Sequence, residues 1–378
     1  MLVIRAYGNI LYAVGQWGGA PGQALVDLEP QHLDAWMEDC RRHGVSTVLW
    51  RANCAGTLTY PSQYTALAGE PPLPHPNRGV GVAVIDQGWT VRDWEVLGAQ
   101  CRNFHTLEAA VQAAHRCGLT LYLDFSTLDM VGSWCTQPEW PGGGQRAFDP
   151  DQWLWSRDQR RRLAGVPCYA DPLVRQHRVA EISEALGTGV DGVWLGFFSH
   201  VDGMAGEQRY GFGYNPEVVE EYAARYGTYP RPNAEDAHRL FALHGEHYTR
   251  FVRQVSQVVR GAGRRLLATA RTDGVHGWGA AEAGGCILGQ LGSQDRRDGR
   301  SELPFAAGLY LEWETWAAEG LVDGLVFWAP WEGGLEALQQ LRQKAGVPVS
   351  LFRKFAGWGG QVRPPPHPGA VPQGGAGR

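Results

Sequence analysis

Two stretches of the chain repeat one pattern of polar and apolar positions. Residues 190–200 read Val-Asp-Gly-Val-Trp-Leu-Gly-Phe-Phe-Ser-His, and residues 322–330 read Val-Asp-Gly-Leu-Val-Phe-Trp-Ala-Pro. Each follows a helical segment, has an Asp-Gly typical of a turn, and continues as an apolar run with the length of a buried strand. A repeat of helix, turn and buried strand predicts a parallel α/β barrel, whose active site lies at the carboxyl ends of the strands.

Apolar runs of strand length recur along the chain, and segments with helical spacing of apolar residues separate them. The predicted strands are residues 3–7, 45–50, 119–125, the run from 190, 266–270, the run from 322, and 347–352. The predicted helices are residues 31–43, 106–117, 172–186, 216–226, 234–261, 309–318 and 334–345. We expect Thr106 and Asp171 to be N-caps of two of these helices, with Pro172 in the first helical position after Asp171.

Seven strands are one fewer than a (β/α)₈ TIM-like barrel requires. Either an eighth strand lies within a loop, such as residues 286–291, or the barrel is incomplete at its C-terminal end. Two irregular stretches, residues 56–105 and 126–169, are too long for ordinary connections. We expect these two long loops to lie over the C-terminal face of the barrel.

The length of 378 residues suits one barrel domain, predicted over residues 1–360, and the Pro/Gly-rich composition of residues 361–378 predicts a disordered tail. The net charge of −5 and the lack of a basic block argue against nucleic-acid binding. No apolar run reaches the roughly 18 residues of a membrane span. The first residues lack the features of a signal peptide, and the seven scattered cysteines form no Cys-x-x-Cys, so we expect a cytoplasmic protein with reduced thiols.

Carboxylates follow three of the predicted strands at their carboxyl ends. Asp124 ends the third strand, Asp273 follows the fifth and Glu332 follows the sixth. Hydrolysis of a glycosidic bond needs two carboxyl groups, so these three are the candidate catalytic residues. Each also has a structural alternative. Asp273 and Glu332 precede glycines and fit turns, and Asp124 fits a turn as well, although an unpaired carboxylate among its apolar neighbours would be costly.

Other polar and aromatic side chains near the strand ends are candidates for substrate binding, because indole rings stack on the C–H faces of sugars. These candidates are Arg51, Asn53, Tyr60, His200, Asp202, Arg271, Trp328 and Trp331. The alternatives are that the 16 tryptophans fill a large core, that Arg51 pairs with a neighbouring carboxylate, and that His200 is a structural hydrogen bonder.

The remaining titratable residues of interest fit structural roles. Asp191 and Asp323 precede strands, at the end of a barrel that serves stability, so we interpret them as turn residues. His244 and His247 are three residues apart on one predicted helix, but no pattern such as His-Glu-x-x-His accompanies them. The sequence therefore predicts no metal site and no cofactor, and it leaves the oligomeric state open.

Five stretches in consistent order resemble the glycosyl-hydrolase-like 10 family of TIM barrels. They are residues 44–51 with 56 and 60–62; residues 113–119; residues 171–172 leading to 190–195; residues 214–216 with 226–227; and residues 316–323. The resemblance covers about residues 30–335. It implies a TIM barrel that acts on a carbohydrate, such as a polysaccharide or a cell-wall glycan.

The chain departs from the pattern of that family in strand four. Where the family has an acid near the end of the strand, this chain has Gly196, and the nearest replacements are His200, Asp202 and Asp124. The leading hypothesis is a glycoside hydrolase that acts on a poly- or oligosaccharide. The alternative is a catalytically silent barrel that binds a glycan without cleaving it. A metal-dependent barrel hydrolase is a third hypothesis, but no clustered ligand set supports it.

Overall fold

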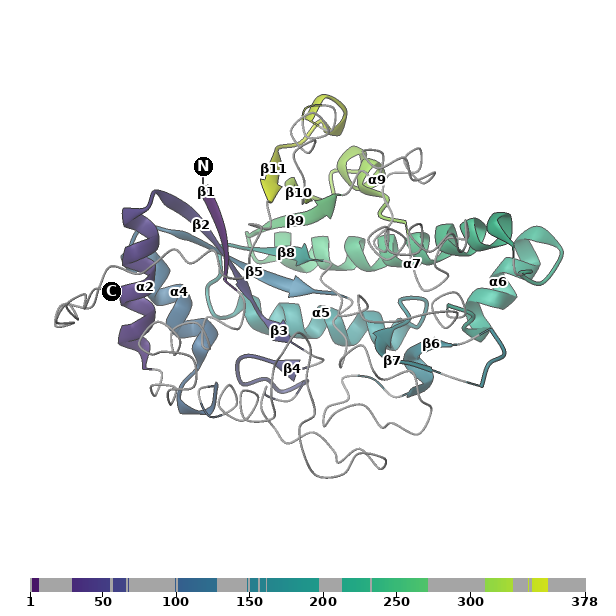
Figure 1. Ribbon diagram of the computed structural model, residues 1–378, viewed down its shortest axis with the longest axis horizontal. Helices are drawn as coiled ribbons and strands as arrows, with labels where there is room; N and C mark the ends of the chain where they lie inside the picture. Colours follow the sequence, from purple (N-terminus) through teal and green to yellow (C-terminus); the bar gives the residue numbers. More distant parts are fainter. Residues whose placement is uncertain are drawn as a thin grey trace, which may run out of the picture.

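Seven parallel strands form the centre of the computed structural model, and they follow one another across the sheet in chain order (Figure 1). They are β1 (Leu2–Ala6), β2 (Val45–Arg51), β5 (Thr120–Ser126), β8 (Gly192–Gly196), β9 (Arg265–Ala270), β10 (Gly324–Trp328) and β11 (Val349–Phe352). All neighbouring pairs are parallel. The structure describes residues 2–6, 29–54, 57–65, 67, 99, 101–127, 148, 150–155, 157–160, 162–196, 213–231, 233–270, 310–328, 339 and 342–352.

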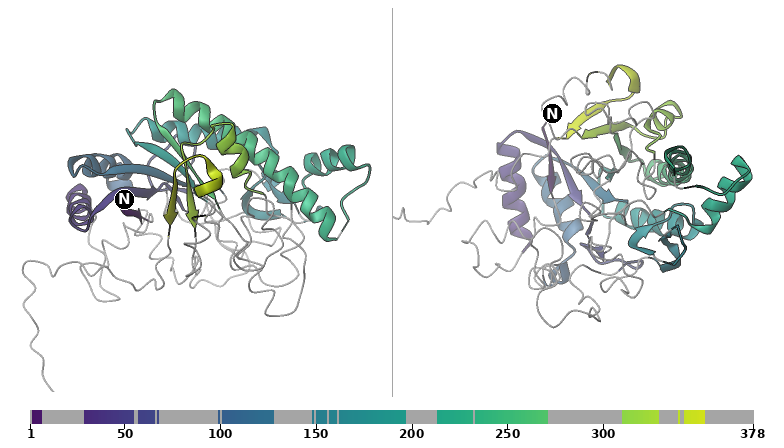
Figure 2. Two further views of the ribbon diagram at one scale, coloured as in Figure 1. Left: turned by 90° about the horizontal axis from the view of Figure 1, so that it is seen from above. Right: turned by 45° about the vertical axis from the view of Figure 1, so that its right-hand side comes forward.

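The predicted α/β class and barrel-type strand order are confirmed. Each of the seven predicted strands is present with small shifts at its ends, and the curled parallel sheet forms a partial barrel (Figure 2). Within the described residues, β1 and β11 are the two edges of this sheet. The candidate eighth strand at residues 286–291 and the tail at 361–378 both lie outside the part of the chain that the structure describes.

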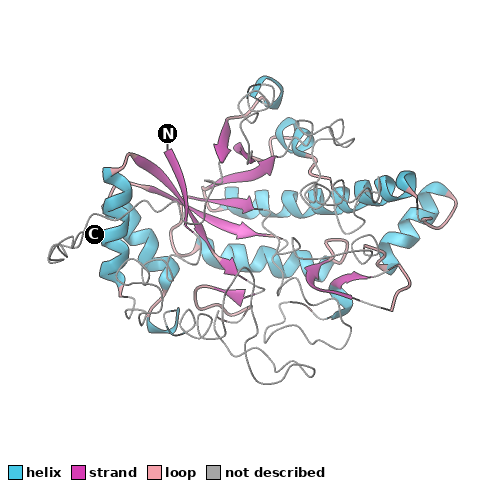
Figure 3. Cartoon of the chain, viewed as in Figure 1, coloured by secondary structure: helices cyan, strands magenta, loops and turns pink. Residues whose placement is uncertain are grey.

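Helices connect most of the strands and pack on the outer side of the sheet (Figure 3). They are α2 (Pro30–Arg42), α4 (Thr106–Arg116), α5 (Pro172–Leu186), α6 (Pro216–Tyr226), α7 (Ala234–Gly261) and α9 (Trp313–Ala318). The prediction of a helix from residue 309 is wrong at its start, because the Tyr310 N–H donates to the Phe241 carbonyl at 3.3 Å and the helix begins at Trp313. Of the helix predicted at 334–345, residues 339 and 342–345 are described, and they are helical.

Two short antiparallel hairpins lie between these elements in the chain. One joins β3 (Asn53–Cys54) to β4 (Thr57–Leu58), directly after β2. The other joins β6 (Trp153–Trp155) to β7 (Arg162–Pro167), after the short 3₁₀ turn Pro150–Gln152. The long loops predicted over residues 56–105 and 126–169 therefore contain regular structure: β4 lies in the first, with β3 just before it, and β6 and β7 lie in the second.

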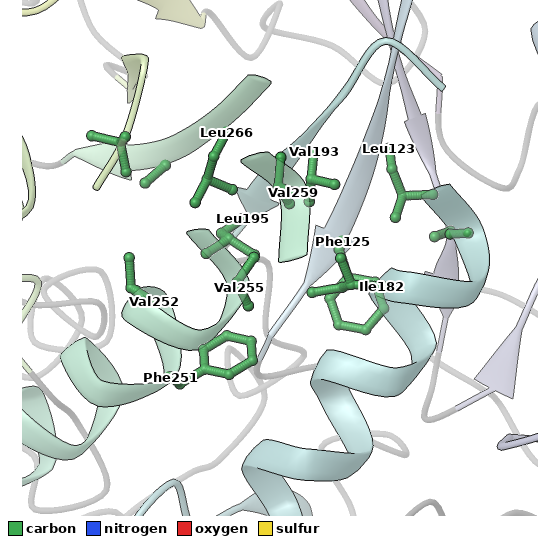
Figure 4. Packing of buried hydrophobic residues seen from close by; sticks show 14 of the residues in the cluster. Leu123, Phe125, Ile182, Val193, Leu195, Phe251, Val252, Val255, Val259 and Leu266 are labelled. Carbon is green, nitrogen blue, oxygen red and sulfur yellow. The ribbon is translucent and has the colours of Figure 1, made fainter. Parts of the chain in front are cut away.

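The two faces of the sheet have different surroundings, because successive side chains of a strand point to opposite faces. Figure 4 shows outer-face residues of β5, β8 and β9 packed against α5 and α7: Leu123, Phe125, Val193, Leu195 and Leu266 against Ile182, Phe251, Val252, Val255 and Val259. On the inner face, Leu49, Tyr122, Trp194 and Val326 form a separate buried cluster. Strand residues in step with these four therefore face the inside of the partial barrel.

The N-termini of two helices test the predicted caps. Asp171 caps α5 as predicted, since its carboxylate accepts the Leu173 N–H at 2.7 Å. The prediction for Thr106 is wrong: His105 caps α4, and its Nδ1 accepts the Glu108 N–H at 3.2 Å. The Thr106 hydroxyl instead donates to a loop carbonyl just after β4.

The two Val-Asp-Gly turns have the same structural role, which confirms their interpretation as turns. The Asp191 carboxylate accepts the Leu121 N–H at 2.7 Å, and the Asp191 N–H donates to the Leu121 carbonyl at 2.9 Å. Asp323 makes the same two bonds to Leu266, each at 2.8 Å. Each aspartate thus ties the start of its own strand to the neighbouring strand. The glycine that follows is required in the first repeat, because a Cβ on Gly192 would lie 2.3 Å from the Tyr122 ring.

Replacing Asp191 with alanine is expected to lower the free energy of unfolding by about 1–3 kcal/mol, because the partly buried Leu121 N–H loses its acceptor. Urea denaturation followed by circular dichroism measures the change. The control is Asp34→Ala, since the exposed Asp34 pairs with Arg116 at the surface and its loss is expected to cost less than about 1 kcal/mol. Equal losses in the two variants would contradict the role assigned to Asp191.

Candidate functional site

Arg51 and Asp124 lie side by side at the carboxyl ends of β2 and β5. They are register partners across the parallel pair, and both are in step with Leu49 and Tyr122, so both side chains belong to the inner face. The Arg51 side chain is 2% exposed and that of Asp124 is 0% exposed. A guanidinium and a carboxyl group are thus buried on adjacent strands, at the end of the sheet where a barrel enzyme places its chemistry.

Backbone contacts hold both residues in place. The Arg51 Nε donates to the Asn53 carbonyl at 2.7 Å, which fixes the chain where β2 passes into β3. The N–H of Ala52 donates to the Asp124 carbonyl at 2.8 Å. The Asn53 side chain, itself buried, bonds to the backbone of Ser126 two residues beyond Asp124. Arg51, Asn53 and Asp124, three of the predicted site residues, therefore lie together.

Strand β8, which pairs with β5, contributes no carboxylate to this end of the sheet. Gly196 is the register partner of Ser126, and the Thr127 N–H donates to the Gly196 carbonyl at 3.1 Å. The position at which the resembling family has an acid therefore carries no side chain here. Among the strand residues whose side chains the structure describes, Asp124 is the one carboxylate on the inner face.

The inner-face residue of β8 in register with Asp124 is a tryptophan. Trp194, the register partner of Asp124 on β8, is fully buried, and its Nε1 donates to the Thr269 hydroxyl at 3.0 Å. The Thr269 hydroxyl in turn donates to the Leu195 carbonyl at 3.0 Å. Trp194 therefore fills the inner core beside Asp124, as the alternative interpretation of the tryptophans expects.

Tyr60, a predicted substrate-binding residue, lies apart from these three on the outer side of the sheet. Its ring is fully buried and stacks on His105 with 5.6 Å between ring centroids, and its hydroxyl donates to the Glu181 carbonyl at 3.5 Å. Burial, with Glu181 nearby, raises the pKa of the Tyr60 phenol well above its usual range. Tyr60 thus packs the core between the helices, and we do not carry it into the proposed site.

Of the other predicted site residues, one lies on a strand and six lie outside the described part of the chain. Trp328 is the last residue of β10, paired in register with Phe352, and its side chain is not among those described. The following predicted residues lie outside the described part of the chain: Asp273, Glu332, His200, Asp202, Arg271 and Trp331.

Sequence reasoning missed a buried ion pair on α5. The Nη1 of Arg178 lies 2.8 Å from the Oε2 of Glu181, and the two side chains are 1% and 0% exposed. The guanidinium also lies over the rings of Phe125, on β5, and Phe148, with 5.4 Å and 4.8 Å to the ring centroids. A signal was present, because the two charged residues occupy the face of α5 that carries Val174 and other buried apolar residues.

The same helix face holds parts of both long loops. The Thr65 hydroxyl bonds to the Glu181 carboxylate and lies 2.8 Å from the Nε2 of His177. The Gln63 N–H donates to the carboxylate of Glu184 at 2.9 Å. From the second loop, Phe148 packs edge-on against His177 with 5.1 Å between ring centroids. Helix α5 therefore contacts both long loops along one face, with the buried Thr65–Glu181 hydrogen bond among these contacts.

The histidines on α7 have structural partners. The Nε2 of His244 lies 2.8 Å from the Gly213 carbonyl, and the Nε2 of His247 lies 2.9 Å from the Glu221 carboxylate. Burial, together with the neighbouring charge of Arg250 in the case of His247, lowers the pKa of both imidazoles to about 4.

In the described part of the chain, no group of three or more His, Cys, Asp or Glu side chains is placed to hold a metal ion. None of the described helices has the length and apolar character to cross a membrane.

Comparisons by sequence found no relatives: no family model matches the chain and no curated protein matches it. The resemblance to the glycosyl-hydrolase-like 10 family therefore does not become a family assignment.

Comparison with solved structures found likeness to glycosidases at low identity. α-L-Fucosidase isoenzyme 2 from Paenibacillus thiaminolyticus is 15% identical, with a TM-score of 0.37, over 66% of this chain and 31% of that one. The family 20 exo-β-N-acetylglucosaminidase from Vibrio harveyi is 12% identical, with a TM-score of 0.38, over 86% and 39%. The β-galactosidase from Marinomonas ef1 is 10% identical, with a TM-score of 0.41, over 86% and 40%. The chain thus spans well under half the length of these proteins, and the likeness concerns the fold alone.

Proposed function

We propose that this protein is a glycoside hydrolase that acts on a poly- or oligosaccharide at the carboxyl end of the sheet, with Asp124 as one of its two catalytic carboxyl groups. The observation that carries the proposal is the buried Arg51–Asp124 pair on the inner face, at the ends of adjacent parallel strands. The place of these two residues in the sheet and the resemblance to the glycosyl-hydrolase-like 10 family together support the proposal.

The chemistry assigns a role to each member of the pair. In glycoside hydrolysis one carboxyl group gives a proton to the leaving oxygen, while the other attacks the anomeric carbon or takes a proton from the attacking water. We assign Asp124 the part of base or nucleophile, and Arg51, its register partner on β2, the part of binding an oxygen of the substrate.

The second carboxyl group of the proposal comes from the chain after β9 or β10. Asp273 follows the last residue of β9 by three positions, and Glu332 follows the last residue of β10 by four. In a barrel these strand ends face the same mouth as β5. The distance between the two carboxyl groups decides whether the reaction inverts or retains the configuration of the sugar.

One observation favours a second function, a barrel that binds a glycan and does not cleave it. Gly196 occupies the strand-four position at which the resembling family has an acid, and its register partner Ser126 supplies no carboxylate either. In such a protein Asp124, the one carboxylate among the described inner-face strand residues, would bind a sugar hydroxyl and take no part in an acid/base pair.

The two functions are separated by incubating the purified protein with a panel of polysaccharides and cell-wall glycans. Chromatography of released reducing ends detects cleavage, and affinity electrophoresis on the same glycans detects binding. Release from at least one glycan is the expected result. Retardation on a glycan without any release would favour the binding protein, and the absence of both would contradict each proposal.

A further inference from the structure

Strand β2 stops offering backbone hydrogen bonds to β5 before β5 ends. The last such bond is from the Ala52 N–H to the Asp124 carbonyl, at 2.8 Å. Beyond it the chain turns into β3 (Figure 1), and the β2 carbonyls are taken by Thr59: its hydroxyl lies 3.2 Å from the Arg51 carbonyl, and its N–H donates to the Ala52 carbonyl at 2.8 Å. Ser126, the last residue of β5, lies two residues beyond this bond.

The side chain of Asn53 bonds to the Ser126 backbone as a peptide group of a neighbouring strand would. Its Nδ2 donates to the Ser126 carbonyl at 2.6 Å, and its Oδ1 accepts the Ser126 N–H at 2.8 Å. A side-chain amide has one acceptor oxygen and a donor nitrogen, as a peptide group has, so it can extend the β ladder by one step. Asn53 is 1% exposed, and at this depth both bonds are shielded from water.

We propose that Asn53 is a positioning residue for Asp124. It holds the segment 124–126 on the β2 side, and the Thr127 N–H, which donates to the Gly196 carbonyl at 3.1 Å, holds the next residue on the β8 side. Hydrogen bonds on both sides therefore hold the backbone segment to which the Asp124 carboxylate is attached. This assignment rests on the proposed function for its catalytic consequence, and it replaces the expectation that Asn53 binds substrate.

A second buried asparagine provides a matched control. Asn215 is also 1% exposed, and its side chain bridges a backbone in the same way: Nδ2 donates to the Trp153 carbonyl at 2.8 Å and Oδ1 accepts the Trp155 N–H at 3.1 Å. Both bonds go to β6, and neither involves β5. Replacing Asn215 therefore shows the general effect on stability of removing such a bridge. The hydrogen bonds of the segment 124–126 stay unchanged in that variant.

The first test is hydrogen–deuterium exchange of the full chain, read by mass spectrometry on peptides that cover residues 121–127. In Asn53→Ala the Ser126 amide is expected to exchange about tenfold faster than in the wild type, as the loss of its acceptor implies. In Asn215→Ala this peptide should keep the wild-type rate. If Asn53→Ala does not fold, Asn53→Leu keeps most of the side-chain volume and removes both the acceptor and the donor. Wild-type exchange at residues 121–127 in the folded Asn53 variant would overturn the proposal.

The second test uses a glycan that the wild type cleaves. A positioning role predicts that Asn53→Asp lowers kcat about tenfold or more while KM stays within about twofold, because the ground-state contacts remain and only the transition state suffers. A raised KM with unchanged kcat would instead make Asn53 a substrate ligand and overturn the assignment. If the wild type cleaves no glycan, the proposed function fails, and the exchange experiment alone decides whether Asn53 holds the Asp124 segment.

Discussion

Replacing Asp124 with asparagine is expected to lower the rate of glycan cleavage by about 10²–10⁴-fold, the usual contribution of a positioned acid or base. Asparagine has the shape of aspartate but can neither take a proton nor attack the anomeric carbon. The carboxylate is fully buried, and the strands on both sides fix its backbone. Initial rates on the glycan with the fastest cleavage by the wild type measure the effect, with far- and near-ultraviolet circular dichroism as the check on folding.

The control for this prediction removes a carboxylate whose ion-pair partner lies on a helix and not at the strand ends. Asp34 on α2 pairs with Arg116 at the surface, at 2.5 Å, so Asp34→Asn changes the net charge equally. It is expected to keep the wild-type rate. A folded Asp124→Asn variant with the wild-type rate would remove Asp124 from the catalytic pair. If the wild type binds a glycan without cleaving it, the Asp124→Asn variant instead tests how much Asp124 contributes to the affinity for that glycan.

Replacing Arg178 with methionine is expected to lower the free energy of unfolding by about 3–5 kcal/mol, the largest effect on stability that we predict. The substitution leaves the Glu181 carboxylate buried without the guanidinium that now lies 2.8 Å from it. It also removes the cation stacked over Phe125 and Phe148. Urea denaturation of each variant, followed by tryptophan fluorescence, gives the change.

A double variant separates the ion pair from the packing. Replacing Arg178 and Glu181 together with apolar residues of similar volume is expected to recover most of the loss, because no unpaired charge then remains in the core. The control is Arg253→Met, which breaks an exposed pair with Glu319 and should cost less than about 1 kcal/mol. A double variant as unstable as Arg178→Met would show that the rings and Thr65, not the charge pair, account for the cost.

The ion pair also has a consequence for pH dependence. Burial by itself raises the pKa of the Glu181 carboxyl, but Arg178, His177 and the Thr65 hydroxyl outweigh it, and the net pKa is below the usual range. The unfolded chain therefore binds this proton more readily than the folded chain does. The contribution of Glu181 to stability is present above its unfolded pKa of about 4.3 and is lost as the pH falls through its folded pKa.

Much of the fold could be predicted because its signals are local. The apolar runs that became β2, β5 and β9 are read from neighbouring residues, as are the Asp171 cap and the Val-Asp-Gly turns. Thr106 shows the limit of such signals, because its hydroxyl found a partner 47 residues away and left the cap to His105.

The candidate site could be predicted only in part. Arg51 and Asp124 were identified because both end apolar runs, and their pairing follows from the register of β2 with β5. The roles of Asn53 and Tyr60 did not follow from their positions near a strand end. Asn53 bonds to a backbone 73 residues away, and Tyr60 bonds to one 121 residues away.

The sequence by itself determined the strands, their order of appearance and the turns between them, because hydrophobic periodicity and turn chemistry act over a few residues. Only the tertiary structure decided which polar side chains meet. It put Asn53 against Ser126, placed Arg178 and Glu181 inside the outer core, and paired Gly196 with Ser126 across β8 and β5. The reason is physical: a buried polar group needs a partner, and that partner comes from whichever strand or helix the fold packs beside it, however distant in the chain.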